Sequence, residues 1–131
     1  MINSFEDLKI WQKAKELCND IHQLTQEDRF AKDYSLKNQI NSSSGSIMDN
    51  VAEGFGRKGN AEFINFLTYA NGSSLECKSQ LYRALERNYI TAEKQSELFE
   101  LIDEITKMIT SLIKYLSHSE IRGEKFKDRK N

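Results

Sequence analysis

The chain has 131 residues, enough for one domain with a hydrophobic core but too few for two ordinary domains. It contains no proline, 30% of its residues are charged, and its formal net charge is −1. A dedicated nucleic-acid-binding protein usually carries a strong positive balance, so any such binding requires a local basic patch. No apolar run approaches the roughly 20 residues of a membrane span.

Two cysteines, Cys18 and Cys77, lie far apart and do not form the framework of a disulfide-rich secreted protein. The opening residues MINSFEDLKIW lack the basic and apolar regions of a signal peptide. We therefore expect a cytoplasmic protein.

The first predicted helix runs from Asp7 to about Thr25, with Ser4 as a plausible N-cap. Its apolar residues recur at steps of three and four, as on one face of a bundle helix. They are Ile10, Ala14, Leu17, Ile21 and Leu24.

The second predicted helix runs from Ser35 to about Gly54 and contains the run NSSSGS at residues 41–46. Alone, this run is typical of a loop. The apolar rhythm continues in phase across it, however, so we predict a helix with a stripe of small residues that lets a neighbouring helix approach closely. The rhythm comprises Leu36, Ile40, Ser43, Ile47 and Val51.

The third predicted helix runs from Ala61 to about Asn88, with Asn60 as its N-cap, and the fourth runs from Thr91 to about Ser117. Both keep the same rhythm of apolar residues. The charged residues 118–131 lack periodicity, and we expect them to form a disordered tail. The sequence thus predicts an all-α protein, an up-down-up-down antiparallel four-helix bundle over residues 1–117.

The third helix carries a second apolar stripe beside its complete core face. A helix that is apolar over more than one face is either central in the domain or also buries a subunit interface. We therefore predict interface residues on this helix, namely Phe66, Leu75, Tyr82 and Tyr89.

The stretch GFGRKG at residues 54–59 fits the dinucleotide-binding pattern G-x-G-x-x-G. That pattern binds a pyrophosphate only where a strand leads in and a helix follows. Here a predicted helix precedes Gly54, so the glycines indicate a helix end and a turn, and no cofactor is expected.

No constellation of residues supports catalysis or metal binding. Cys18 and His22 lie four apart on one helix, but a zinc site needs four ligands and free cysteine is commonly a buried small residue. The serine run contains no G-x-S-x-G elbow. We expect a protein without catalytic residues, metal or cofactor.

Polar residues next to core positions are expected to form a structural cluster, paired with basic side chains such as Arg57 and Lys58, because buried charges are generally paired. This cluster comprises Asn50, Glu53, Glu76 and Gln80. The best candidate nucleic-acid surface comprises Arg57, Lys58, Lys78, Arg83 and Arg87. The alternative for these basic residues is a solvated face beside an oligomer seam.

Several motifs follow one another along residues 5–116. They are Phe5-x-Asp7-Leu8-x-Ile10-Trp11-Gln12-x-Ala14, Tyr34-x-Leu36-x-x-Gln39-Ile40, Ser46-Ile47-x-x-Asn50-Val51-Ala52-Glu53-Gly54, Phe63-x-x-Phe66-Leu67-x-x-Ala70-x-Gly72-Ser73-x-x-Glu76 and Gln80-Leu81. Together they resemble the four-helix-bundle family of 23S rRNA intervening-sequence proteins, also called the S23 ribosomal protein family.

The resemblance implies a bundle that assembles into a ring-like homopentamer. It also implies kinship with the accessory variability determinant of diversity-generating retroelements, which binds nucleic acid and a reverse transcriptase through a basic surface. The implied partners are other copies of the chain, RNA or DNA, and a protein such as a reverse transcriptase. The family usually has two arginines where this chain has Asn41 and Ser42. The loss of this arginine pair removes two phosphate contacts and so weakens the expectation of nucleic-acid binding.

Two hypotheses follow for the function. The first is a non-enzymatic, homo-oligomeric scaffold or adaptor, expected to be pentameric. The second is a nucleic-acid-binding accessory factor that acts through basic residues on the oligomer surface.

Overall fold

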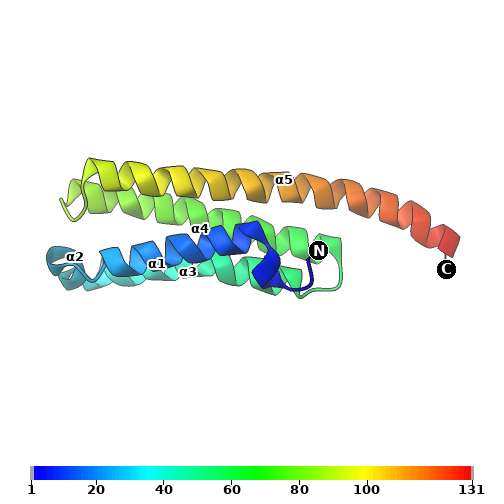
Figure 1. The fold of residues 1–131 in the computed structure, drawn as a ribbon, viewed down its shortest axis with the longest axis horizontal. Coiled ribbons are helices and arrows are strands. Elements are labelled where there is room, and N and C mark those ends of the chain that lie inside the picture. The colour runs from blue at the N-terminus through cyan, green and yellow to red at the C-terminus, as the bar shows by residue number, and fades with distance from the viewer. Residues whose placement is uncertain (1, 131) are drawn as a thin grey trace.

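A computed structural model of the chain describes the backbone of residues 2–130 and the side chains of residues 2–119. Four long helices lie antiparallel in a bundle, and no strand occurs in the described part (Figure 1). The predicted up-down-up-down four-helix bundle is therefore confirmed. The elements are η1 (Phe5–Asp7), α1 (Lys9–Leu24), α2 (Asp28–Lys32), α3 (Tyr34–Phe55), α4 (Asn60–Glu86) and α5 (Ala92–Lys130).

The four helices enclose one continuous core. Helices α1 and α4 each pack against both α3 and α5, so α1 and α4 occupy diagonally opposite corners. The residues of each predicted apolar stripe turn inward, as a period of 3.6 residues requires. The largest fully buried side chains are Leu17, Ile21, Phe30, Leu36, Ile40, Ile47, Leu67, Leu81, Leu98, Ile102, Ile105 and Ile109.

The serine-rich segment of α3 is helical, as the apolar rhythm predicts, and it lies in the interior of the bundle. Ser43 and Ser44 are buried. The Ser43 hydroxyl lies 3.2 Å from the carbonyl oxygen of Ile40 and 2.5 Å from Oε1 of Gln80 on α4. The small Ser43 side chain satisfies its hydroxyl group and leaves room for α4, with which α3 shares its most extensive interface. The Ser44 hydroxyl donates to the carbonyl oxygen of Asn41 and lies beside Cys18 of α1.

Gly54 explains the glycine pattern at residues 54–59. It lies in the last turn of α3, is buried, and faces the start of α4. A Cβ atom on Gly54 would lie 2.7 Å from Cβ of Phe66 and 2.9 Å from Cδ1 of Phe63. The glycine therefore permits a close approach of two helices, and the expected helix end and turn are observed in place of a strand.

The helix starts differ from the predicted ones in two places. Ser4 caps the short η1 in place of α1, and Gly59 in place of Asn60 occupies the N-cap position of α4. The additional helix α2 was missed because five residues are too few to show a period.

Helix α5 continues to Lys130, beyond the predicted end at Ser117, and projects past the other helices (Figure 1). Residues 118–130 contain no proline and many residues of high helix propensity, which explains how a helix continues without an apolar stripe. The side chains from residue 120 onward lie outside the described residues. The division into a domain of residues 1–117 and a separate tail stays a prediction.

We expect Gly54→Ala to lower the free energy of unfolding by about 1–3 kcal/mol, because the new methyl group overpacks the contact with Phe63 and Phe66. Gly56→Ala is the matched control, since its Cβ would meet only backbone oxygens at 3.5 Å and 3.7 Å. Urea unfolding followed by circular dichroism measures both variants. Equal stability of the two would contradict the proposed role of Gly54.

Candidate interaction surfaces

The outward face of α4 forms a second seam with the same spacing as the core stripe. Its positions follow steps of four and three, all are exposed, and none carries a charge. Leu75 and Tyr82 are large apolar residues seven positions apart on this face, yet they remain 58% and 51% exposed. Large apolar side chains at the same position of successive heptads are usually buried. We call this surface the outer seam, and it comprises Ala61, Asn65, Thr68, Gly72, Leu75, Ser79 and Tyr82.

The outward face of α5 shows what a solvated helix of this chain looks like. Its exposed positions at the same spacing include Glu100, Asp103, Lys107 and Lys114. In a chain with 30% charged residues, an uncharged seam along α4 is a local exception. Exposed large apolar side chains such as Leu75 and Tyr82, grouped on one uncharged face, are typical of sites of protein association.

The outer seam continues onto α5 through one aromatic contact. The rings of Tyr82 and Phe99 meet edge to face with centroids 5.0 Å apart, and the ammonium group of Lys78 lies 5.0 Å from the Phe99 centroid. Lys78 also forms an ion pair with Asp103 at 3.0 Å. The α5 side of the seam is thus held in a fixed arrangement.

The four predicted interface residues separate into three environments. Leu75 and Tyr82 lie on the outer seam. Phe66 is half-buried on the side of α4 that faces α3, under the guanidinium of Arg57 and against Tyr69. Tyr89 lies at the end of the bundle, because α4 ends at Glu86 and the chain reverses at Asn88, which has a φ of 60°.

Tyr89 belongs to a polar network that ties α2 and α3 to the α4–α5 turn. Its ring stacks on Phe30, and its hydroxyl donates to Asp33 at 2.9 Å. Asp33 also accepts from Arg87 at 2.7 Å and caps α3 by accepting from the backbone N–H of Leu36 at 3.1 Å. These contacts, led by the Leu36 hydrogen bond, hold the pKa of Asp33 below its ordinary value.

The predicted nucleic-acid surface is not one surface. Arg57 and Lys58 lie in the α3–α4 turn, whereas Arg83 and Arg87 lie at the opposite end of α4. Arg83 donates to Gln39, Arg87 pairs with Asp33, and Lys78 pairs with Asp103. The five basic residues therefore lie at the two ends of α4 and near its middle. Several of them are held by hydrogen bonds or ion pairs within the chain.

The predicted polar cluster is dispersed in the same way. Gln80 is buried against Ser43, and Asn50 donates to Ser46 on its own helix. Glu53 forms the expected ion pair with Arg57, at 2.6 Å, but the pair lies on the surface and not beside the core. Glu76 is exposed. A polar ladder that sequence reasoning did not identify joins α3 to α4 through Ser43–Gln80, Ser46–Ser73 and Gln39–Arg83.

The cysteines lie in the interior beside these serines. Burial raises the pKa of Cys77 to about 12, and it also raises the pKa of the half-buried Cys18, which hydrogen-bonds to Ser44. His22 is exposed on α1. Among the side chains that the structure describes, no group of three or more His, Cys, Asp or Glu residues is placed to hold a metal ion.

The fold and its surfaces define a class of protein: a small four-helix bundle whose distinctive feature is an uncharged, exposed face along α4. In the described part, no helix has both the length and the apolar character to cross a membrane. Residues 6–111 match the 23S rRNA-intervening sequence protein family, and the chain belongs to this family.

One solved structure from the same family supports this assignment. It is the crystal structure of a protein with unknown function from the S23 ribosomal protein family of Bacteroides thetaiotaomicron. The two chains share 27% sequence identity with a TM-score of 0.74, over 80% of this chain and 98% of the other. The search of curated proteins found no match.

Asp33 makes the stability of the bundle dependent on pH. Because its folded-state pKa is depressed, its contribution is present above the ordinary aspartate pKa of about 4 and is lost as the pH falls through the folded-state value. We expect the melting temperature to fall between pH 7 and pH 3, and Asp33→Asn to reduce that fall.

Asp33→Asn keeps an oxygen that can cap α3, whereas Asp33→Ala loses the cap as well, at a cost of about 0.5–2 kcal/mol. We therefore expect the alanine variant to be the less stable of the two at neutral pH. Thermal unfolding of the three proteins from pH 3 to pH 7 measures both effects. An Asp33→Asn variant with an undiminished pH dependence would exclude Asp33 as the titrating group.

Proposed function

We propose that this protein is a non-enzymatic, homo-oligomeric scaffold or adaptor. The observation that carries the proposal is the outer seam, which keeps heptad spacing without a charge from Ala61 to Tyr82. A helix face with this spacing can interlock with a second helix by packing knobs into holes. Gly72 and Ser79 provide the space into which a partner's side chains would fit.

Self-association accounts for this face more simply than a solvent-exposed role does. The core of the single chain is already complete on the opposite side of α4, so the outer seam is not needed for the fold. Exposed Leu75 and Tyr82 lose unfavourable contact with water when another subunit covers them. The stoichiometry that the family resemblance implies is a pentamer, and the protein is expected to act in the cytoplasm.

We expect the wild-type protein to sediment as an oligomer, with a pentamer as the predicted mass, and Leu75→Glu to dissociate it. The new carboxylate would be buried without a partner in the interface but remains solvated in the monomer. Tyr34→Glu is the matched control, because Tyr34 is 71% exposed at the start of α3, away from the outer seam.

Light scattering coupled to size exclusion measures the mass of each variant. A wild-type monomer at micromolar concentration would exclude the scaffold. Dissociation of the Tyr34→Glu variant as well would show that the effect is not specific to the outer seam.

The α3–α4 turn supports a second candidate, a nucleic-acid-binding accessory factor related to the retroelement determinant that binds a reverse transcriptase. Arg57 and Lys58 are both exposed there. The Arg57–Glu53 pair is a surface pair, which is worth little, so Arg57 remains available to a phosphate. In a closed oligomer such turns repeat around one rim, which would multiply a weak single contact.

This second function requires RNA or DNA binding that weakens steeply with salt. Replacement of Arg57 and Lys58 by alanine is then expected to make the fall of log K, the association constant, with log salt less steep. The magnitude of the slope should decrease by about one for each lost phosphate contact. Replacement of Arg83 and Arg87 tests the other end of α4. Fluorescence anisotropy with a short labelled RNA measures these slopes, and no binding at low salt would end this candidate.

A further inference from the structure

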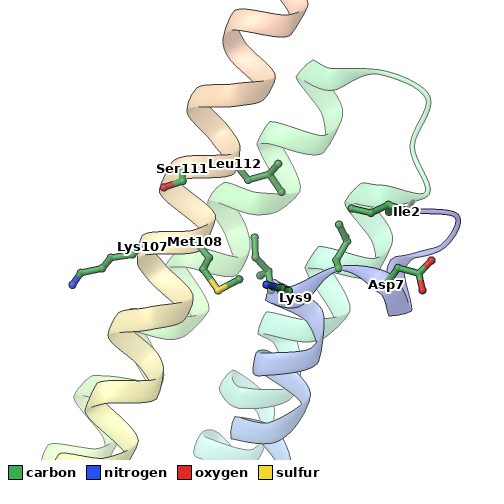
Figure 2. Close-up of a pocket in the computed structure, with 9 residues that line it drawn as sticks. Ile2, Asp7, Lys9, Lys107, Met108, Ser111 and Leu112 are labelled. Atoms are coloured by element: carbon green, nitrogen blue, oxygen red, sulfur yellow. The ribbon is translucent and has the colours of Figure 1, made fainter.

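A second unpartnered apolar surface lies between α1 and α5. We call it the α1–α5 groove, and it has a volume of about 710 Å³. Its walls are Ile2 and Leu8 from the N-terminal segment, Ile10 from α1, and Met108 and Leu112 from α5. Figure 2 shows Met108 and Leu112 turned toward the N-terminal segment and Ile2 turned toward them, while Lys107 and Asp7 point away at the two edges.

The groove is incomplete as a piece of core. Leu8 and Ile10 are buried beneath it, but Met108 and Leu112 are only partly buried, and Ile2 remains 54% exposed. Helices α1 and α5 share a smaller interface than the other neighbouring pairs of long helices. The groove therefore offers apolar area that the single chain does not cover.

The groove and the outer seam lie on different sides of the molecule. The seam faces outward at the α4 corner, whereas the groove opens between α5 and α1, and α1 is the corner diagonally opposite α4. A two-fold dimer that pairs one seam with another would leave both grooves open. Only a head-to-tail arrangement covers a seam and a groove at each contact, and it closes into a ring when the rotation permits.

Beside the two surfaces, the charged side chains that make no hydrogen bond or ion pair among the described residues are complementary. Lys9 and Lys107 lie at the groove, where Asp7 instead accepts from the backbone N–H groups of Asn3 and Ser4. Glu62 and Glu76 are exposed along the edge of the outer seam that faces α3, where Arg83 instead donates to Gln39. Among the described residues, none of these four takes part in an intramolecular ion pair. Opposite charges at the rims of two apolar surfaces favour their association and fix its orientation.

We propose that the α1–α5 groove receives the outer seam of a second copy of this chain, with Leu75 and Tyr82 of one copy against the groove wall of the next. This pairing rests on the proposed homo-oligomeric function and specifies which surfaces meet. It assigns the short N-terminal segment, through Ile2, to the interface.

The test is complementation between two variants. Leu75→Glu disables the seam, and Ile2→Glu disables the groove without touching a long helix. Each variant alone is expected to lose the wild-type mass, with a dissociation constant raised at least about tenfold. An equimolar mixture retains one intact seam and one intact groove, so it is expected to form a heterodimer. Met108→Glu is a second groove variant, with circular dichroism as the check on folding.

Charge reversal is the second measurement. Lys9→Glu together with Lys107→Glu is expected to weaken assembly, and adding Glu62→Lys with Glu76→Lys to the same chain is expected to restore it. Light scattering gives the mass in each case, with Tyr34→Glu as the control that keeps the wild-type mass.

The outcomes separate the inference from the function on which it rests. If wild type and both groove variants keep the full mass while Leu75→Glu dissociates, the scaffold stands and the groove is not its partner surface. If the mixture stays monomeric although each variant dissociates alone, the head-to-tail pairing is also overturned. A monomeric wild type overturns both.

Discussion

The close contact between α3 and α4 is the constraint on which the rest of the bundle depends. It is possible because α3 presents Ser43 to α4 and has Gly54 in its last turn, where a Cβ atom would collide with Phe63 and Phe66. The serines have low helix propensity, so the helix is maintained by packing and by the hydrogen bond to Gln80. With one side of α4 fixed in this way, its opposite side is free to serve another purpose.

Much of the fold was predictable because the apolar residues recur along the sequence with the period of an α-helix. Steps of three and four locate all four long helices and the buried residues on each. The same spacing placed Tyr89 on one face with Leu75 and Tyr82, but α4 ends at Glu86, before Tyr89. A heptad count cannot detect this helix end or the reversal of the chain at Asn88.

The candidate surface was predictable in part. Leu75 and Tyr82 stand out as large apolar residues beside a complete core stripe, but Thr68, Gly72 and Ser79 carry no apolar signal of their own. Their meaning appears only when the structure shows that all of them face solvent and that the corresponding face of α5 is charged. The α1–α5 groove depends on how far two helices diverge, a property that a single sequence does not encode in any local pattern.

The core stripe and the outer seam of α4 are interleaved but share no residue. Core positions such as Leu67, Leu81 and Ala84 are fully buried, whereas every seam position faces outward. Substitutions along the seam are therefore expected to leave the fold intact while they change the chemistry of the exposed surface. Within a lineage, such a helix can vary on its outer side while the architecture of the bundle stays constant.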